Sequence, residues 1–402
     1  MKVLIVSSQP PSAFSGGEIR LLNLLKYLSG DYDFTVIAPI FGRPEPGLAY
    51  ADRYCRFLPV LLPGRIPQRS RLYWRLNTWR QALLIREPHA VTALSSPLFR
   101  NAVDNLVCSE TFDVVQVQQL HMVQYLPAGF DGPTVLDVDN LWSKLRQRMM
   151  EIAPERGFTR RVLANIDGRK KFKYEKSAVR KFDACLAVCQ EDEVVIRTLA
   201  PQVMTAVVAN GVDTSYYVSQ QVAGQAERSI LFTGTMNWRP NIDAVKFFVN
   251  DVFPIIQRND PSTVFRIVGR NPTQDVRELA QSPKIDVTGF VEDVRPYMAE
   301  STVYIVPLRA GAGTRLKILE VLAMGKAVVS TSLGAEGLEV TDGENVLIAD
   351  EPGEFAAKVI GLLRNQGLRE KLGRNGRRLV ESRYDWSVIA PTLGQVYETL
   401  QA

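Results

Sequence analysis

The chain has 402 residues, of which 46% are hydrophobic and 23% are charged, as in a globular protein large enough for two domains. No apolar run approaches the roughly eighteen residues of a spanning helix, and the apolar start at residues 2–8 is too short for a secretory leader, so we expect neither. The net charge of +5 is uneven, with 27 Lys and Arg against 20 Asp and Glu in residues 1–205, and 21 against 23 in residues 206–402.

Strands and helices alternate through the first half. The sequence predicts strands at 2–8, 34–40, 112–120, 133–140, 183–189 and 205–213, and helices at 16–30, 98–108 and 174–182. A polar stretch at 218–229 then interrupts the pattern.

The alternation restarts after this break. We expect strands at 230–235, 263–270, 285–290, 303–308 and 326–331, helices at 240–258, 294–301, 314–324, 354–365 and 368–382, and a last helix at the end. Apolar strands alternating with helices predict parallel sheets covered on both faces. We therefore expect an α/β protein of two Rossmann-like, doubly wound domains that face each other across a cleft, with ligands bound beyond the carboxyl ends of the strands.

The positive charge gathers in two segments. Residues 53–80 interleave seven Arg with five aromatic residues, and residues 168–181 are also rich in Lys and Arg. A solvated helix face with core aromatics, a surface that docks on an anionic membrane, and a nucleic-acid site all remain open from composition alone. We favour membrane contact through 53–80 among the two binding alternatives and expect no nucleic-acid partner.

Cysteine and histidine usage argues against a metal site. Cys185 and Cys189 are four residues apart in a predicted strand, but the chain has only two His and no second Cys pair near them. We expect buried thiols in a reducing cytoplasm, and neither metal nor cofactor.

A glycine pair opens the first predicted helix. Gly16 and Gly17 follow a strand and could contact an anion, although a plain tight turn is the favoured explanation of the pair taken alone. The pattern is not GxGxxG, no acidic residue closes the second strand, and no GxxxxGK[ST] occurs. These absences argue against a nicotinamide or flavin site and against a P-loop enzyme.

The stretch "AGAGTRLKILE", residues 310–320, is the strongest local signal. We expect a buried helix over 314–324 with Arg315 and Lys317 in its first turn, where cations are unfavourable unless an anion lies between them. Gly311 and Gly313 precede it and allow close approach of a ligand. The two cations could neutralise a diphosphate, and Glu320 could accept hydrogen bonds from a ribose diol; an internal Lys317–Glu320 pair is the structural alternative.

This stretch and several others carry a resemblance. The segments "VPLRAGAGTRLKILEVLAMGKAVVSTSLGAEGL", "NGVDT", "FTGTMNWRPNIDAV", "VGR", "VTGFVEDVRPYM" and "RYDWSVIAPTLGQVYETL" resemble GT-B glycosyltransferases of the family 4 type. The resemblance covers nearly the whole chain and is most specific over 205–340. It implies an N-terminal acceptor-side domain at 1–206, a C-terminal donor-binding domain at 207–385, and a helix at 386–402 that crosses back.

The resemblance also assigns roles. It implies that Arg315 and Lys317 contact the diphosphate, with the backbone of Gly313 and Thr314 beside them, and that Glu320 binds the ribose. The remaining implied donor contacts are Gly16, Gly17, Gly234, Gly289, Phe290, Val291 and Gly311. The family's first Glu of E-x7-E falls at Ala312, which leaves the sugar contact and the sugar's identity open.

His121 follows a predicted strand and matches a family His that lies near the sugar and the leaving phosphate. We expect it to hydrogen-bond the sugar or developing charge and not to abstract a proton as a fixed base, with a purely structural histidine as the alternative. Asp139 and Asn140, at the strand end 137–140, are candidates for acceptor contact, with a simple turn as the alternative; His89 is assigned to the surface.

The sequence therefore favours a cytoplasmic, retaining glycosyltransferase that uses a nucleotide-diphosphate sugar, UDP-sugar before GDP-sugar, and a saccharide or lipid-linked acceptor. The implied mechanism is front-face, with the leaving diphosphate accepting the acceptor's proton and no metal required. A nucleotide-sugar 2-epimerase of the same fold and a non-catalytic GT-B partner subunit remain as alternatives.

Overall fold

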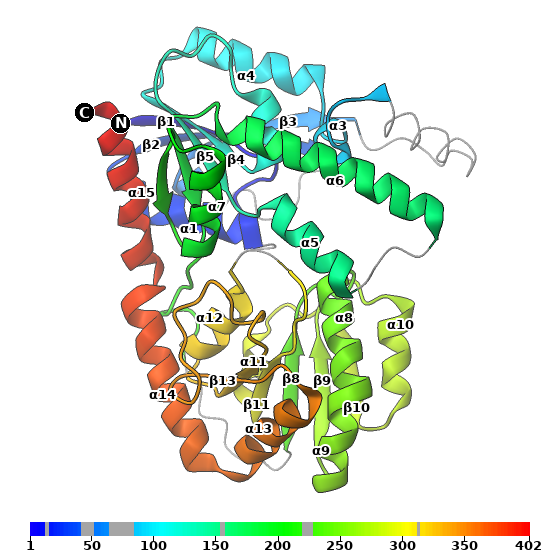
Figure 1. Cartoon of the computed structure of the whole chain (residues 1–402). Coiled ribbons are helices and arrows are strands. Elements are labelled where there is room, and N and C mark those ends of the chain that lie inside the picture. Colours follow the sequence, from blue (N-terminus) through cyan, green and yellow to red (C-terminus); the bar gives the residue numbers. More distant parts are fainter. Residues whose placement is uncertain (13–15, 42–51, 64–83, 153–156, 219–227, 312–313) are drawn as a thin grey trace. The chain divides into compact units, whose positions relative to one another are not determined.

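The computed structural model describes the whole chain except residues 13–15, 42–51, 64–83, 153–156, 219–227 and 312–313. It divides into two compact units, one of Met1–Ala209 together with Ile389–Ala402 and one of Asn210–Val388 (Figure 1). The observed division falls after Ala209, whereas the sequence placed it after residue 206.

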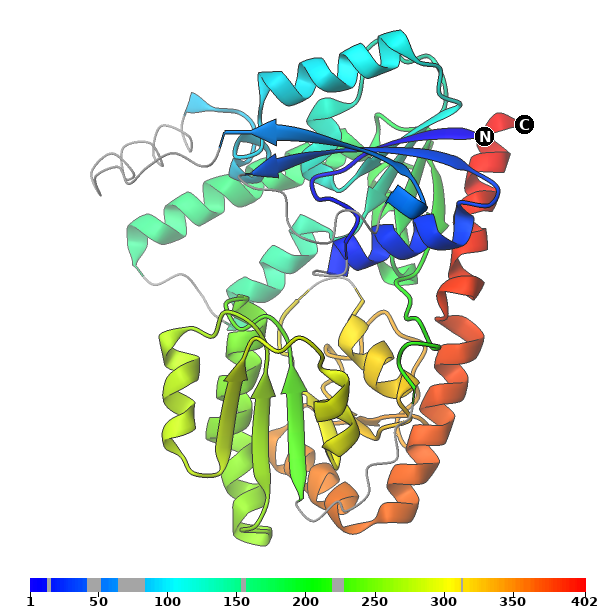
Figure 2. The same cartoon turned by 180° about the vertical axis from the view of Figure 1, so that it is seen from behind.

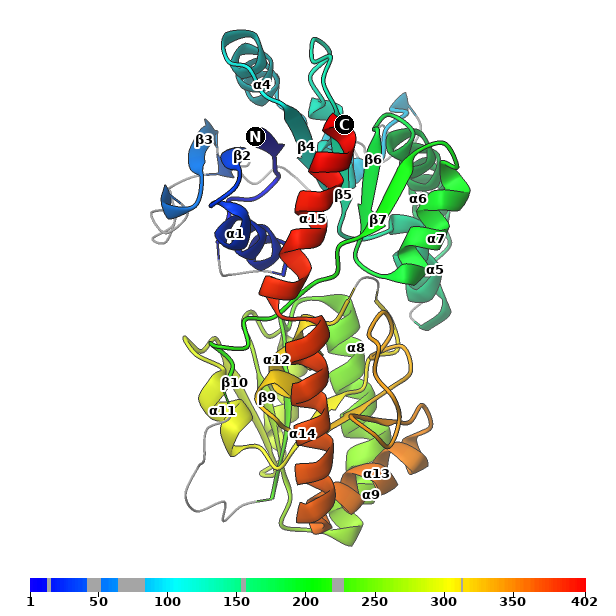
Figure 3. The ribbon, with the colours of Figure 1, turned by 90° about the vertical axis from the view of Figure 1, so that its left-hand side faces the viewer.

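The first unit is built on a parallel sheet. Its seven strands lie in the order β3-β2-β1-β4-β5-β6-β7, and Figure 3 shows them running from β3 and β2 at one side to β6 and β7 at the other. The elements are β1 (Lys2–Val6), α1 (Gly16–Leu28), β2 (Asp33–Phe41), β3 (Arg56–Leu62), α3 (His89–Thr92), α4 (Pro97–Ser109), β4 (Val114–Gln118), the 3-10 helix η2 (Leu120–Tyr125), β5 (Thr134–Val138), α5 (Trp142–Ile152), α6 (Phe158–Val179), β6 (Ala184–Ala187), α7 (Gln190–Leu199), β7 (Met204–Val207) and most of α15 (Trp386–Gln401).

The second unit is a second parallel sheet. Its six strands lie in the order β10-β9-β8-β11-β12-β13, and Figure 2 shows the arrows of β10, β9 and β8 side by side. The elements are β8 (Ser229–Thr233), α8 (Arg239–Phe247), the π-helix η3 (Phe248–Val252), α9 (Phe253–Asn259), β9 (Val264–Val268), α10 (Gln274–Arg277), the 3-10 helix η4 (Glu278–Gln281), β10 (Ile285–Gly289), α11 (Arg295–Glu300), β11 (Val303–Val306), α12 (Leu316–Ala323), β12 (Val328–Ser330), β13 (Leu347–Ile348), α13 (Pro352–Arg364) and α14 (Gln366–Arg383).

The central strands explain why the pattern was readable. The burial of β1 after its first residue and of β4, β5, β6, β8 and β11 throughout matches near-continuous apolar runs, as expected for parallel strands covered on both faces. The predicted pair of doubly wound parallel sheets is confirmed.

Three local predictions need correction. The basic segment 53–80 contains the edge strand β3, which we did not predict because Pro59 and the nearby arginines are unusual in a strand. This strand pairs with β2, and Pro59 lies opposite Ala38. The helix expected over 240–258 is interrupted by the π-helix η3, which ends at Val252, two residues before Pro254. The helix predicted over 174–182 is only the last part of α6, which begins at Phe158. The prediction started too late because Gly168, a poor helix former, lies inside this longer helix.

The thiols and the helices give two further facts. Cys55, Cys185 and Cys189 are buried as expected, but Cys108 is exposed on α4. No helix in the described part of the chain has both the length and the apolar character needed to cross a bilayer.

A buried ion pair lies in the first unit. Arg20 of α1 donates from Nε and Nη2 to Asp137 of β5, at 3.0 Å and 3.2 Å, and both side chains are fully buried. Arg20 also donates to the backbone oxygen of Ala209, and Gln118 donates to Asp137. The strand end 137–140, where we expected acceptor contacts, thus begins with a structural carboxylate.

Candidate functional site

Glycines stand at the carboxyl ends of three neighbouring strands in the second unit. Gly234 follows β8, Gly269 follows β9, and β10 ends at Gly289, whose φ of 78° favours glycine. A Cβ on Gly269 would lie 1.7 Å from the backbone oxygen of Gly234, and one on Gly234 would lie 2.9 Å from Lys317 Nζ. Glycine at 269 therefore allows the backbones that follow β8 and β9 to approach each other, and glycine at 234 leaves room for the Lys317 amine.

Lys317 lies in the first turn of α12 and reaches this edge of the sheet. Its Nζ donates to the backbone oxygen of Thr233 at 2.7 Å and to Oδ1 of Asn241 at 3.1 Å. Burial, and after it the positive charge of Arg315, lower the pKa of Lys317, the charge of Glu320 partly opposes both, and the resulting pKa is about 7. An ammonium has three N–H donors, so one remains for an anion beyond the two bonds that the described residues accept.

Arg315 precedes α12 instead of lying in its first turn. Its φ of −88° and ψ of 87° are not helical, so it occupies the N-cap position, and its side chain is buried. A Cβ on Gly311 would lie 2.5 Å from Arg315 Nη2, so glycine at 311 makes room for the guanidinium. Thr314 is buried beside it, and the predicted contact Gly313 lies outside the described residues, as does Ala312.

Glu320 faces Tyr217, a residue that the sequence did not single out. The Tyr217 phenol donates a hydrogen bond to the Glu320 carboxylate. Burial raises the pKa of Glu320, whereas the Tyr217 bond and the charge of Lys317 lower it. Two tyrosines shortly after "NGVDT" were the available signal, but only the fold brings Tyr217 to α12.

The end of β10 is open to solvent. Phe290 is 65% exposed, Val291 is half-buried, and no atom lies within 4 Å of a Cβ built on Gly289. Nearby in the sequence, Arg295 pairs with Asp293 and covers the Tyr216 ring at 3.8 Å from its centroid. An exposed aromatic ring at a strand end suits stacking on a flat ligand group.

In the first unit, α1 begins at Gly16 and brings Gly17 against two polar side chains. A Cβ on Gly17 would lie 3.1 Å from Gln119 Nε2 and 3.4 Å from Asp139 Oδ2. Gln119 holds a φ of 74°, which is strained for a non-glycine residue, and donates to Asp139 at 3.3 Å. Asn140 also hydrogen-bonds Asp139, whose pKa burial raises.

His121 lies in η2, two residues after Gln119. Its Nε2 is buried and has no hydrogen-bond partner among the described residues, and burial lowers the pKa of the imidazole to about 4. The ring stacks parallel to that of Trp142, with centroids 6.4 Å apart, and Trp142 stacks in turn on Tyr174 at 6.0 Å. The imidazole is therefore neutral near pH 7, and its ring is packed against the stacked rings of Trp142 and Tyr174.

The predicted residues thus fall into two groups. In the second unit Gly234, Gly311, Arg315, Lys317 and Glu320 gather around the start of α12, and in the first unit Gly17, Asp139 and Asn140 gather around Gln119. The sequence analysis missed four residues that contact these predicted ones. Asn241 and Tyr217 contact Lys317 and Glu320 in the second unit, and Gln119 and Trp142 contact Asp139 and His121 in the first. Within the described ranges, no three His, Cys, Asp or Glu side chains form a group that could hold a metal ion.

Comparison with known protein families gives a match that lies within the second unit. Residues 227–365 match the family described as Glycosyl transferases group 1, which confirms the resemblance there. The phosphatidyl-myo-inositol mannosyltransferase of Mycobacterium tuberculosis H37Rv is 30% identical over 206 residues, which are 48% of this chain and 53% of that protein. The capsular polysaccharide biosynthesis glycosyltransferase CapM of Staphylococcus aureus is 30% identical over 125 residues, 30% of this chain and 32% of that protein. The chain spans about half or less of the length of these relatives.

Solved structures match over the full chain. Sucrose-phosphate synthase from Thermosynechococcus elongatus superposes with a TM-score of 0.75 at 16% identity, covering 99% of this chain and 98% of that one. Anabaena Alr3699/HepE, solved with UDP and glucose, superposes with a TM-score of 0.67 at 14% identity, covering 99% and 100%. The fold is GT-B, as predicted.

Proposed function

We propose that the protein is a retaining glycosyltransferase that takes a sugar from a nucleotide-diphosphate donor, a UDP-sugar before a GDP-sugar. The acceptor would be a saccharide or a lipid-linked saccharide of polysaccharide or glycoconjugate synthesis. The observation that carries the proposal is the gathering of Lys317, Arg315 and Glu320 beside the glycine-lined strand ends of the second unit. The matched family and the named relatives support the reaction class.

Each group suits one part of the donor. The Lys317 amine and the Arg315 guanidinium would neutralise the diphosphate, and the Glu320 carboxylate would accept hydrogen bonds from the ribose hydroxyls. Phe290 would stack on the base. Because two cations and the start of α12 would stabilise the leaving group, the reaction needs no metal ion in this proposal.

The proposed chemistry is front-face transfer. The bond from the anomeric carbon to the diphosphate breaks while the acceptor oxygen bonds to the same face of the sugar, and the leaving diphosphate takes the acceptor's proton. Neutral His121 would donate a hydrogen bond to the sugar, because an imidazole with a pKa of about 4 is a weak base. Asp139 and Asn140 would contact the acceptor, and Gly16 and Gly17 would approach the donor.

The donor proposal is tested by calorimetric titration with UDP, GDP, ADP and dTDP. We expect micromolar binding of one diphosphate, weakened roughly ten- to hundredfold by Lys317→Ala, because a charge-assisted hydrogen bond is lost. Lys326→Ala is the matched control, since Lys326 is half-buried like Lys317 and has a lowered pKa, but it follows the carboxyl end of α12 and donates to the backbone oxygen of Ala299. If no diphosphate binds, the cations are structural and the partner-subunit alternative takes precedence.

Turnover separates the remaining alternatives. Release of free nucleotide with an acceptor, and a product of unchanged anomeric configuration by NMR, supports retaining transfer. Appearance of an epimeric sugar without any acceptor supports a 2-epimerase, although the chain has only two His for acid–base work. Binding without either product supports a non-catalytic subunit, which Ala312 favours.

We also propose that the protein works in the cytoplasm and docks on an anionic membrane surface. Its four cysteines are free thiols, as suits a reducing compartment. Most of the basic segment 53–80 lies outside the described residues, but α6 offers a described basic surface. Its solvent-facing side, the α6 basic face, consists of Phe158, Arg161, Arg169, Phe172, Lys173 and Lys176.

The α6 basic face carries cations and exposed rings without a carboxylate. Phe158 is 84% exposed and Phe172 is 48% exposed, while Glu175 is fully buried and Asp167 pairs with Lys171. Cations with interspersed apolar rings complement anionic headgroups over an acyl boundary. Exposed phenylalanines favour a bilayer over nucleic acid as the partner.

Flotation with anionic vesicles tests this docking. The triple variant Arg161→Glu, Arg169→Glu, Lys173→Glu should abolish co-flotation at physiological salt, because each cation contributes about 1 kcal/mol near such a surface. Lys371→Glu, Arg374→Glu, Arg378→Glu on α14 is the matched control, since those exposed cations stand among the carboxylates of Glu370 and Glu381. Wild type that does not float, or equal loss in both variants, would refute docking through α6.

A further inference from the structure

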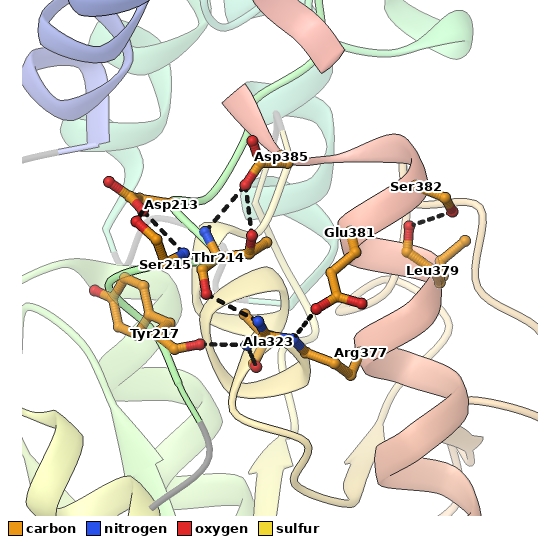
Figure 4. A network of polar contacts seen from close by, with 10 residues as sticks. All are labelled: Asp213, Thr214, Ser215, Tyr217, Ala323, Arg377, Leu379, Glu381, Ser382 and Asp385. Carbon is orange, nitrogen blue, oxygen red and sulfur yellow. Dashed lines mark hydrogen bonds and ion pairs between the residues drawn. The ribbon is translucent and has the colours of Figure 1, made fainter. Parts of the chain in front are cut away.

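Arg377 of α14 uses its guanidinium to join segments that are distant in the sequence. Figure 4 shows it pointing away from α14 toward the chain around residues 214–217 and the end of α12. It donates from Nη2 to the backbone oxygen of Thr214 at 2.9 Å and from Nη1 to the backbone oxygen of Tyr217 at 2.6 Å. The same Nη1 donates to the backbone oxygen of Ala323.

The guanidinium is itself held in place. Glu381, one turn further along α14, accepts a hydrogen bond from Arg377 Nε at 2.6 Å. The Arg377 side chain is only 25% exposed, so its contacts are shielded from water. A planar guanidinium offers N–H groups in a fixed fork, which an ammonium cannot reproduce.

Ala323 is the last residue of α12, so its carbonyl lacks an intrahelical partner. Arg377 satisfies it and places a positive charge at the negative end of the helix dipole. Glu320 lies three residues earlier on the same helix. Fixing the end of α12 therefore also fixes the backbone from which the Glu320 carboxylate extends.

The loop on the other side of the guanidinium has its own supports. Asp213 accepts hydrogen bonds from the backbone N–H groups of Ser215 and Tyr216. Asp385 accepts from the N–H and hydroxyl of Thr214, and Figure 4 shows these two bonds and the one from Ser215. These bonds make residues 213–216 a compact turn. Arg377 connects this turn to α12 through the carbonyl of Tyr217.

We infer that Arg377 is a positioning residue for ribose recognition, which holds the Tyr217 loop and α12 in the register that lets the Tyr217 phenol aim the Glu320 carboxylate. The inference rests on the proposed function, because it assumes that Glu320 binds the ribose of a nucleotide-diphosphate donor. Arg377 touches neither the donor nor the acceptor in this account. It acts through the backbone of Tyr217 and of α12.

Ribose recognition has a readout separate from general stability. A carboxylate that binds the ribose diol should make the protein prefer UDP over 2′-deoxy-UDP, or GDP over 2′-deoxy-GDP, and the ratio of the two dissociation constants measures that preference. Loosening the whole unit weakens both nucleotides by the same factor and leaves the ratio unchanged. Misaiming Glu320 reduces the ratio.

The experiment measures this ratio calorimetrically for wild type, Arg377→Gln, Tyr217→Phe, the double variant and Arg377→Lys. We expect Arg377→Gln and Tyr217→Phe each to lower it about five- to tenfold, because a hydrogen bond to a charged group is misaligned or lost. The double variant should fall no further than either single variant, since both act on one carboxylate. Arg377→Lys, which keeps the charge but not the fork, should be intermediate.

Arg374→Gln, on the same helix but 64% exposed, is the matched control and should keep the wild-type ratio. Equal weakening of both nucleotides by Arg377→Gln, additive effects in the double variant, or an unchanged ratio would each overturn the inference. Wild type that binds no diphosphate overturns the proposed function instead. If Arg377→Gln unfolds below working temperature, Arg377→Lys and Tyr217→Phe decide through the same ratio.

Discussion

The ammonium of Lys317 lies 4.1 Å from the centroid of the Phe232 ring, one residue along β8 from the Thr233 carbonyl that accepts its hydrogen bond. The ring face and the carbonyl oxygen both favour a positive charge there, whereas burial and Arg315 disfavour it. The balance holds the pKa of Lys317 at about 7. The proton on this amine is therefore available for coupling to ligand binding.

We predict that binding of the donor diphosphate takes up a proton at Lys317. The free amine has a pKa of about 7, and an adjacent diphosphate raises it, so the complex holds more protons than its free components between pH 7 and the new pKa. Affinity should therefore fall as the pH rises from 7 toward 9, because a growing fraction of the free amine is deprotonated. Calorimetry at pH 8 in buffers of different ionisation enthalpy should show uptake of about one proton in wild type.

Lys317→Met removes the titrating group while retaining much of the volume, so this variant should show no uptake at pH 8. Lys326→Met serves as the control, since Lys326 lies away from the strand ends and should keep the uptake. Equal uptake in wild type and Lys317→Met would show that another group titrates on binding.

We predict that His121 stays neutral down to about pH 4. Burial against Trp142 lowers the imidazole pKa from 6.5 to about 4. Because the chain has only two His, a His89→Gln variant leaves one histidine signal for an NMR titration. A midpoint near 6.5 for that signal would contradict the buried, stacked position of the ring.

The same shift predicts a contribution to acid sensitivity. Between pH 6.5 and about 4 the unfolded chain binds a proton at His121 and the folded chain does not, so falling pH favours unfolding across this window; above pH 6.5 the contribution is constant. His121→Phe lacks this group. Its stability should therefore decline less than that of wild type between pH 6.5 and 4, by urea unfolding at several pH values, while transfer activity falls at all of them.

The parts of this molecule that follow from local pattern were predictable, and the parts made by long-range contact were not. The buried strands could be read from β-rich apolar runs, and the buried face of α12 from its composition. The placement of Arg315 before that helix could not, because it depends on the guanidinium turning back onto Gly311. Similarly, β3 is hidden by Pro59 and becomes a strand only through its pairing with β2.

The candidate site shows the same division. Lys317 and Glu320 stand in one short sequence, so their shared role could be proposed from spacing. Tyr217 and Arg377 contact α12 although they lie about a hundred and about fifty residues from it in the sequence. No periodicity in the sequence predicts contacts at such separations. Gln119 was passed over because a positive φ is not visible in a sequence whose residue there is not glycine.

We predict that the Arg20–Asp137 pair is far more important for stability than the exposed Arg56–Glu110 pair. Asp137→Asn leaves the Arg20 charge buried without its carboxylate, which should cost about 3–5 kcal/mol. Glu110→Gln should cost no more than about 1 kcal/mol, because Arg56 and Glu110 are 53% and 36% exposed. Urea midpoints compare the two, and a double Arg20→Met, Asp137→Leu variant should be less destabilised than Asp137→Asn. Equal midpoints for Asp137→Asn and Glu110→Gln would contradict the buried pairing.

The backbones at Gly234 and Gly269, just after β8 and β9, are in close contact, so we predict that adding one methyl group at Gly269 strongly destabilises the protein. Gly269→Ala would place its Cβ 1.7 Å from the Gly234 oxygen, so β8 and β9 must separate where Lys317 is held, and we expect a loss of about 3 kcal/mol or more. Gly30→Ala is the control, because no atom lies within 4 Å of its Cβ and its φ is not positive; it should be neutral or stabilise by about 0.5 kcal/mol. Thermal unfolding measures both, and diphosphate titration of Gly269→Ala below its midpoint should show weakened binding as well. A Gly269→Ala protein with wild-type stability and affinity would mean that β8 and β9 do not approach in this way.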